Sequence, residues 1–571
     1  MKAGWVSRRL KIGLVAGVVG LGFVAPPLMV GADAPAYTVS KASAYGGEPS
    51  IASDNAGRLY VSSLLAARAD RSTDGGVTWT QGATNAYSST GDDCLATDQA
   101  TVLYLCNLTI TGPSNAPLQG DVYRSNDLGD HWTHGAGVPF GANPNCATSC
   151  NPFGMDRDWL DAYIPPATTG AAEVALMYHD FYGPSHIWVN LSQDGGLTFG
   201  EPQDVLANLS PSAGAGSALA LADTACSTVP AAVKVAKGGP HPGRVYVAWI
   251  AADPSSFGSG CNLSQAQAFH NLFVAWADPT TPGGRLAATP TWTPQLAFDA
   301  GLFHDSSTPF VGFTLDNQGN PYFGFAVQNP GYSPQVCAAP QQPQTAACEY
   351  DMYVAWSPDG GPTWNGGGGT VAGSAASAYK VNSDTGTHFF PTIAAGDPGH
   401  VDVAYLRTSD VIPTDANGKQ HPGGCLPAAG KATCTSTDQW YLWAGQSTNL
   451  LDNQGHVNPT PTWALTQITP SPMHQGDICN LGIACPPTAN RHLSDFISVA
   501  LDPVGCAHIA FADDKTTNQV NAANQTAGCF VSLPVSVPEA PWLLLLLPVG
   551  AAVAGLVEVR RRRRRRGLVL G

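Results

Sequence analysis

Charged and polar side chains recur at one kind of position in this 571-residue sequence, just before a strand–turn–strand pattern. These residues are Glu48, Asp92, Asp93, Asp156, Arg157, Asp158, His304, Asp305, His388, Arg491, His492 and Asp495. A carboxylate beside a buried strand is costly unless it is paired or holds a metal ion. These positions are therefore where chemistry is expected.

Glycan hydrolysis is one chemistry that these residue types could perform. Two carboxylates can divide general acid and general base work between them, and Asp93 with Asp158 is one such pair. In this interpretation the candidate catalytic residues are Asp93, Asp158, Arg157 and Arg491.

Ligand binding without catalysis is a second interpretation, and the one we favour. The rings of Trp159, Phe389 and Phe496 adjoin the polar positions and could stack on a sugar. The candidate ligand-binding residues are Glu48, Trp159, His304, His388, Phe389 and Asp495.

Cation binding is a third interpretation. Clustered aspartates together with backbone carbonyl groups suit Ca²⁺ better than zinc or iron. The candidate ligands are Asp92, Asp156 and Asp305. No other cofactor is indicated.

Internal ion pairing is the alternative that needs no ligand. Arg157 could pair with Asp156 or Asp158, and Arg491 with Asp495, simply to stabilise the fold.

Seven strand–turn–strand units must position these residues. Apolar alternation around a turn that contains Asp, and often Gly, predicts a hairpin in each unit. The units span residues 48–62, 92–105, 155–178, 220–249, 308–325, 389–405 and 495–511. With 63 glycines, 46 prolines and few long helical patterns, the sequence predicts an all-β protein.

A second repeat, Ser-x-Asp-x-Gly-x-x-aromatic, follows four of these units. Its copies are Ser72–Trp79, Ser125–Trp132, Ser192–Phe199 and Ser357–Trp364. In each copy the Asp accepts backbone N–H groups, Gly takes the positive φ and the ring covers a turn between two strands. The turn-forming aspartates are Asp74, Asp127, Asp194 and Asp359. Decayed copies follow at Asp278 with Thr291-Trp292, and at Trp443 with Thr462-Trp463.

This repeat resembles the Asp-box, or bacterial neuraminidase repeat, of the sialidase superfamily. The resemblance implies a β-propeller of four-stranded blades, with each box between the third and fourth strands and away from the active site. Sialidase chemistry would need three arginines, an acid/base Asp and a Tyr nucleophile assisted by Glu. Only Arg157 and Arg491 stand at the expected ring positions, and Glu48-Pro49-Ser50-Ile51 replaces the usual Arg-Ile-Pro motif.

Seven hairpin units favour seven blades over the six that are usual in sialidases. The last unit lacks an outer strand after Asp514, so we expect Tyr37–Tyr45 to supply it and close the ring. Residues 33–516 would then form the propeller.

Both ends of the chain carry targeting features. Residues 1–32 have the basic start, apolar stretch and small-residue cleavage site of a signal peptide. Residues 517–541 read as a linker ending in Pro-Glu-Ala-Pro, residues 542–559 as an apolar transmembrane segment, and residues 560–571 as a basic cytoplasmic tail. Together they resemble bacterial C-terminal sorting signals of the PEP-CTERM kind, which implies an anchored or sorted protein at a bacterial cell surface.

The 14 cysteines fit an exported, disulfide-bonded protein. Pairing neighbours along the sequence predicts seven local bridges: Cys94–Cys106, Cys146–Cys150, Cys226–Cys261, Cys337–Cys348, Cys425–Cys434, Cys479–Cys485 and Cys506–Cys529.

The formal net charge of −15 argues against nucleic acid as a partner. We therefore expect a monomeric, surface-displayed propeller that binds glycan or protein ligands at the mouth of its central channel. A glycoside hydrolase, an exo-sialidase or a related enzyme, is the alternative.

Overall fold

The structure is a computed structural model. It describes residues 34–530 except for gaps at 65, 67, 85–90, 111–117, 137, 139–154, 167–170, 181–185, 210–218, 220–227, 253–268, 282, 301–305, 307–309, 329–349, 365–377, 409–438, 453, 477, 479–491 and 516–518. The elements of the described residues are all β-strands. No helix in these ranges is long and apolar enough to cross a membrane, and the predicted signal peptide, transmembrane segment and tail lie outside them.

Seven antiparallel sheets form the blades, and the strands of each blade follow one another from the innermost outward. Blade 1 has β2 (Ser50–Ser53), β3 (Leu59–Ser62) and β4 (Asp70–Ser72), with a bridge from Arg71 to Thr80 at its edge. Blade 2 has β5 (Asp93–Thr97), β6 (Leu103–Ile110), β7 (Leu118–Ser125) and β8 (Thr133–His134). Blade 3 has β9 (Met155–Tyr163), β10 (Glu173–Asp180), β11 (Ile187–Ser192) and β12 (Gln203–Asp204).

The remaining blades repeat the arrangement. Blade 4 has β13 (Val229–Val235), β14 (Val245–Ala252), β15 (Phe269–Ala277) and β16 (Thr293–Asp299). Blade 5 has β17 (Gly312–Leu315), β18 (Pro321–Gln328), β19 (Tyr350–Trp356) and β20 (Tyr379–Lys380). Blade 6 has β21 (Thr387–Ala395), β22 (Val401–Thr408), β23 (Gln439–Ser447) and β24 (Ala464–Gln467), and β25 (His474–Gln475) also pairs with β23. Blade 7 has β26 (Ser498–Leu501), β27 (Ala507–Asp513), β28 (Gln519–Ala527) and β1 (Ala36–Tyr45).

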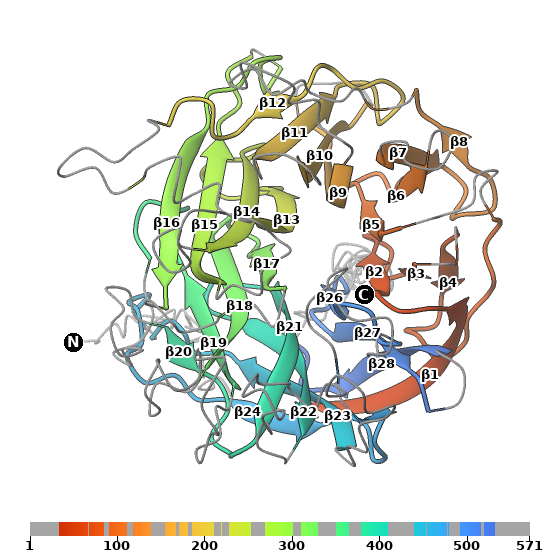
Figure 1. Ribbon diagram of the computed structural model, residues 1–571, viewed down its shortest axis with the longest axis vertical. Helices are drawn as coiled ribbons and strands as arrows, with labels where there is room; N and C mark the ends of the chain where they lie inside the picture. The colour runs from red at the N-terminus through yellow and green to blue at the C-terminus, as the bar shows by residue number, and fades with distance from the viewer. Residues whose placement is uncertain are drawn as a thin grey trace, which may run out of the picture. The chain divides into compact units, whose positions relative to one another are not determined.

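The seven blades close into a ring (Figure 1). Each innermost strand contacts the next in the order β2, β5, β9, β13, β17, β21 and β26, and β26 contacts β2 again. The N-terminal strand β1 is the outermost strand of blade 7. Seven blades and closure by the N-terminal strand are thus confirmed.

The predicted propeller boundary at residue 516 is wrong, because β28 lies inside the segment assigned to the linker. The sequence of β28, Gln-Val-Asn-Ala-Ala-Asn-Gln-Thr-Ala, lacks the apolar alternation of a strand. Its amides are nevertheless buried and bonded: Gln519 donates to the carbonyls of Ala42 and Ala44, and Asn524 donates to that of Gly76. Side-chain hydrogen bonds therefore add to the apolar packing of Val520 and Ala523 in this strand.

The tryptophans of the repeated Val-Ala-Trp segments pack between blades. Trp249 and Trp356 are fully buried and Trp276 is nearly so. Trp249 stacks on Phe273, and Trp356 stacks on Tyr322.

The four Ser-x-Asp-x-Gly-x-x-aromatic turns all follow the third strand of a blade, after β4, β7, β11 and β19. In the first, Asp74 Oδ1 accepts from Ser72 Oγ at 2.8 Å and from Thr78 N at 2.9 Å, while Oδ2 accepts from Thr78 Oγ1 at 2.6 Å. Asp194 and Asp359 repeat these three bonds with their own Ser and Thr. Asp127 repeats the pattern with His131 in place of Thr.

The decayed copy after β23 keeps part of this geometry. Asn449 stands where the other turns have Asp, and its Oδ1 accepts from Ser447 Oγ and from Thr462 N. The residues inserted between Asn449 and Thr462 therefore lengthen this turn, but the hydrogen bonds of Asn449 are kept.

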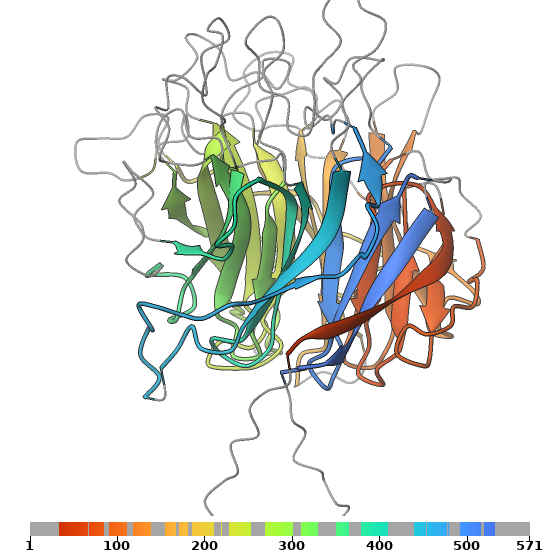
Figure 2. The same cartoon turned by 90° about the horizontal axis from the view of Figure 1, so that it is seen from below.

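A second set of acidic turns joins the first and second strands of blades 1, 2 and 5. Asp54, Asp98 and Asp316 each accept two backbone N–H groups and the hydroxyl of a Tyr six residues later. Because successive strands run antiparallel, these turns share one end of the ring with the Ser-x-Asp turns. The innermost strands begin at the opposite end, and Figure 2 shows the strands running between the two ends.

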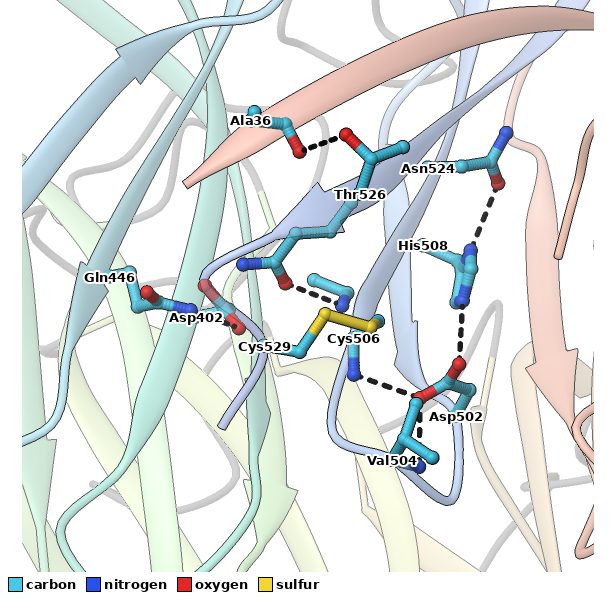
Figure 3. Close-up of a disulfide and its surroundings, with 12 residues drawn as sticks. Ala36, Asp402, Gln446, Asp502, Val504, Cys506, His508, Asn524, Thr526 and Cys529 are labelled. Carbon is cyan, nitrogen blue, oxygen red and sulfur yellow. Dashed lines mark hydrogen bonds and ion pairs between the residues drawn. A yellow bond between two sulfur atoms is a disulfide. The ribbon is translucent and has the colours of Figure 1, made fainter. Parts of the chain in front are cut away.

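Two predicted disulfides are confirmed, Cys94–Cys106 and Cys506–Cys529. The second joins Cys506, just before β27, to Cys529, just after β28, next to the turn at Asp502 (Figure 3). The cysteines of the other five predicted bridges lie outside the described residues.

Candidate functional site

A buried arginine gathers carboxylates from three other blades at the end of the ring where the innermost strands begin. Arg157, in β9 of blade 3, lies 3.6 Å from Glu48 of blade 1 and 3.6 Å from Asp92 of blade 2, and pairs directly with Asp495 of blade 7. We call Arg157, Glu48, Asp92, Asp156, Asp158 and Asp495 the Arg157 cluster. The predicted local pairing of Arg157 with its neighbours Asp156 or Asp158 is therefore wrong; its ion pairs join separate blades.

Aromatic rings cover the other side of Arg157. Its guanidinium carbon lies 3.7 Å from the ring centre of Phe310, which precedes β17 of blade 5, and 5.5 Å from that of Phe496. Phe496 in turn lies 5.1 Å from Trp159, which is only partly buried. The guanidinium thus makes ionic contacts and cation–π contacts at once.

The backbone around the cluster adopts conformations with positive φ, which residues other than Gly rarely take. Glu48, Arg157 and Ser494 have φ values of 49°, 55° and 57°. At Arg157 the register of β9 shifts against β10, which is why Arg157 and Asp158 are both buried although they are adjacent. A Cβ on Gly47 would fall 2.1 Å from Ser494 Oγ, so the segments that carry Glu48 and Asp495 are packed tightly together. Such local strain is common at functional sites.

Burial has the largest effect on the pKa values of the carboxyl groups in the cluster. Loss of water raises the pKa of Glu48 and that of Asp92, although Arg157 acts in the opposite direction on both. The pKa of Asp158 is raised well above its usual range by burial and by the neighbouring charges of Asp92 and Asp93. The nearby carboxylates raise the pKa of Arg157, which stays cationic.

Asp158 and Asp156 differ in what surrounds their carboxyl groups. Asp158 is 1% exposed, and neither of its carboxyl oxygens has a hydrogen-bond partner among the described residues. Asp156 has a side chain that is 22% exposed, and its Oδ2 lies 3.3 Å from Nε2 of the buried His179. Asp156 is therefore the more accessible of the two carboxyl groups, whereas Asp158 is enclosed and has no hydrogen-bond partner among the described residues.

The structure brings together most of the predicted site residues, namely Glu48, Asp92, Asp156, Arg157, Asp158, Trp159 and Asp495. It removes Asp93 from the catalytic pair, because that carboxylate accepts hydrogen bonds from Ser62 and Asn107 within the blades. The predicted residues His304, Asp305 and Arg491 lie outside the described residues.

Two predicted ligand-binding residues, His388 and Phe389, are structural. His388 is fully buried, with Nδ1 2.8 Å from the carbonyl of Tyr350 and Nε2 3.3 Å from Asp384. Phe389 is fully buried against Trp440 and cannot stack on a ligand. The exposed His492 lies 3.3 Å from Asp514, which also contacts His474.

Two residues of the site were not predicted, Phe310 and His179. Phe310 occupies the position before the fifth innermost strand, so the repeat itself could have indicated it. His179 lies at the end of a second strand, and no signal in the sequence relates it to Asp156.

Within the described ranges, no group of three or more His, Cys, Asp or Glu side chains is arranged to hold a metal ion. The proposed Ca²⁺ ligands Asp92 and Asp156 lie in the cluster, whereas the third, Asp305, lies outside the described residues. Calcium binding therefore stays a prediction.

Neither protein-family models nor curated proteins match this sequence. Three of the solved structures that resemble the chain are an ulvan lyase of polysaccharide lyase family PL25 bound to -[GlcA(1-4)Rha3S]-, the GH93 α-L-arabinofuranosidase of Fusarium graminearum with arabinobiose, and YCF48 from Cyanidioschyzon merolae. They are 12%, 11% and 11% identical, with TM-scores of 0.41, 0.31 and 0.37. Each alignment covers 86% of this chain, and 97%, 98% and 99% of the respective structures. These values are too low to carry an argument about function, and the assignment of seven blades rests on the strand order.

Proposed function

We propose that this protein is an exported, surface-anchored propeller of the Asp-box type that binds glycans at the Arg157 cluster. The single observation that carries the proposal is Asp158, a carboxyl group that is 1% exposed and lacks any hydrogen-bond partner among the described residues. Burying an unsatisfied carboxyl group opposes folding, and a ligand that bonds to it would remove that cost.

The surroundings suit a sugar. A pyranose ring presents hydroxyl groups on its edge and C–H groups on its faces. The cluster offers carboxyl acceptors at Asp156 and Asp92, which are partly exposed, and a partly exposed aromatic ring at Trp159.

Sialidase chemistry fits less well. Among the described arginines only Arg157 lies in the cluster, and it already contacts three carboxylates. It is therefore not available to bind the carboxylate of a sialic acid, and we do not extend the proposal to that substrate.

Glycoside hydrolysis by another route is the second candidate, favoured by the raised pKa of Asp158. A carboxyl group that stays protonated at neutral pH can act as a general acid, and the partly exposed Asp156 would serve as its carboxylate partner.

A glycan array probed with the full-length protein tests binding, with Asp158→Asn as the site variant. We expect a restricted set of glycans to bind, and the variant to lose them while keeping its melting temperature. Uniform absence of binding, or retention by the variant, contradicts the proposal. Incubating each bound glycan with the protein and analysing the products separates hydrolysis from binding.

A further inference from the structure

A lysine stands in the innermost strand of blade 4, where the other side chains are apolar. Lys234 lies near the end of β13, whose sequence is Val-Pro-Ala-Ala-Val-Lys-Val, and its neighbours Val233 and Val235 are buried. Lys234 itself is partly buried. The other lysines of the described residues are all exposed: Lys41, Lys237, Lys380 and Lys515. Removing an ammonium group from water opposes folding unless a partner compensates its charge.

Lys234 has no such partner within the described ranges. Asp161 of β9, in blade 3, is the acid whose charge acts on Lys234. Its carboxylate already accepts hydrogen bonds from the backbone N–H groups of Ala162 and Val235, and it pairs with Lys237 at 3.1 Å. Among the described residues the Lys234 ammonium group forms neither a hydrogen bond nor an ion pair. Its charge is therefore left uncompensated.

Lys237 places these groups on the inner side of the ring, at the end that carries the Ser-x-Asp turns. Its Nζ also lies 3.1 Å from the carbonyl oxygen of Thr97, at the end of the innermost strand of blade 2. The innermost strands contact one another in the order β5, β9 and β13, so blade 3 separates blade 2 from blade 4. The link from Lys237 to Thr97 must therefore run along the inner side of β9. Lys234 belongs to the same innermost strand and is partly exposed, so solvent reaches its side chain.

The surroundings of Lys234 favour its neutral amine over its ammonium form. Loss of water lowers the pKa of Lys234. Asp161 acts in the opposite direction, and the positive charge of Lys237 lowers the pKa further.

The other titratable groups on the elements that pack against β13 are engaged elsewhere. In β10, Glu173 accepts a hydrogen bond from a backbone N–H group, and His179 contacts the Arg157 cluster. In β14, the hydroxyl of Tyr246 donates to a backbone carbonyl. The charged residues at the start of β9 belong to the Arg157 cluster at the other end of the ring, and β17 has no titratable side chain. Asp161 and Lys237 therefore set the charge around Lys234.

We propose that Lys234 is a nucleophilic lysine that condenses with small aldehydes. The lone pair of its neutral amine attacks the carbonyl carbon, and the π electrons of the C=O bond move to the oxygen. A proton passes from nitrogen to that oxygen to give a carbinolamine, which loses water to form the C=N bond of an imine. Desolvation and a neighbouring cation are the conditions that activate a lysine amine for this reaction. An uncharged aldehyde enters a partly buried site without the cost of desolvating a charge.

The inference does not depend on glycan binding, because Lys234 and the Arg157 cluster lie at opposite ends of the innermost strands. Failure of one proposal therefore leaves the other standing.

Reductive alkylation tests the proposal. The full-length protein is treated with acetaldehyde and cyanoborohydride, which reduces the imine to a stable secondary amine, and peptide mass spectrometry follows each lysine. At pH 7 we expect Lys234 to react at least roughly threefold faster than the exposed Lys41 and Lys515, since a lower pKa leaves more of the amine neutral. The reaction of Lys234 should also accelerate at a lower pH than that of the two exposed lysines.

Variants of Lys237 test the electrostatic cause. Lys237→Met removes the neighbouring cation and leaves Asp161 available to Lys234, so the reaction of Lys234 should slow. Lys237→Arg keeps the positive charge and should keep the rate. Melting curves show whether the variants are folded, and the comparison of lysines within the wild type decides the proposal even if they are not.

The proposal is overturned if Lys234 reacts no faster than Lys41 and Lys515 in the native protein. Modification of Lys234 only after unfolding in urea also overturns it, because the amine would then be inaccessible. An unchanged rate in a folded Lys237→Met variant contradicts the stated activation. A faster reaction of Lys234 that is slowed by Lys237→Met and kept by Lys237→Arg supports it.

Discussion

Replacing Arg157 by Met tests whether this side chain holds four blades together. Methionine keeps much of the volume and the contact with the Phe310 ring, but removes the charge. Glu48, Asp92 and Asp495 would then share a buried site with no cation among the described residues. Breaking a buried ion pair from one side costs about 3–5 kcal/mol, because a charge is left without compensation.

The matched control is Arg71→Met, which breaks the ion pair of Arg71 with Asp130 on the surface. These side chains are 22% and 48% exposed, so the loss should not exceed about 1 kcal/mol. Urea unfolding followed by tryptophan fluorescence measures both free energies of unfolding. Adding Asp495→Asn to Arg157→Met removes one of the uncompensated charges. The double variant should therefore recover part of the lost free energy of unfolding, so that the effects of the two substitutions are not additive.

The pH dependence gives a further check on Arg157→Met. Without the arginine, the folded-state pKa values of Glu48 and Asp92 rise further above those of the unfolded chain. The folded protein then holds protons that the unfolded chain releases, so stability falls as pH rises through that interval. The loss should therefore be smallest at acid pH. An Arg157→Met variant as stable as Arg71→Met at neutral pH, or a strictly additive double variant, would refute the reasoning.

Three shorter predictions concern other parts of the ring. Burial raises the pKa of Asp402 to about 8, so stability should fall as pH rises from about 4 to 8, and Asp402→Asn should make that slope in pH-dependent melting shallower. Asp98→Ala leaves three hydrogen-bond donors without their acceptor and should cost roughly 3 kcal/mol in urea unfolding. Tyr104→Phe removes only one of these three hydrogen bonds and should cost about 1 kcal/mol. Replacing Cys506 and Cys529 by Ser opens a loop of 23 residues and should cost roughly 3 kcal/mol relative to the oxidised wild type in urea unfolding.

The parts of the fold that could be predicted from the sequence are those made by neighbours in the chain. The turn at Asp74 is built from Ser72 and Thr78, and Cys94 bridges to Cys106 only 12 residues away. The resemblance of these turns to the Asp-box implied a propeller, and the seven strand–turn–strand units predicted seven blades. The strand β28 escaped prediction because four of its buried side chains are amides, and the partners of Gln519 and Asn524 lie in β1 and in the first Ser-x-Asp turn.

The site was predicted only as a set of positions. Asp92 and Asp93 look alike in the sequence, but successive residues of an extended segment point to opposite sides. Asp93 therefore bonds to Ser62, whereas Asp92 lies near Arg157. Arg157 and Asp495 are 338 residues apart, and only closure of the ring brings them together. No local pattern distinguishes that pair from the wrong pairing of Arg157 with its neighbours.

The two ends of the ring use the same residue type in opposite ways. At the turn end, hydrogen bonds from Ser, Thr and backbone N–H groups lower the pKa of Asp74 to about 2, so the carboxylate is ionised and fully engaged. At the other end, Asp158 receives no such donors from the described residues, and burial raises its pKa. The number of donors, rather than the residue type, thus separates an aspartate that shapes a turn from one whose buried carboxyl group has no donor among the described residues. Because the Ser-x-Asp turns fix blades 1, 2, 3 and 5 at one end, the other end can hold such a carboxyl group without losing the fold.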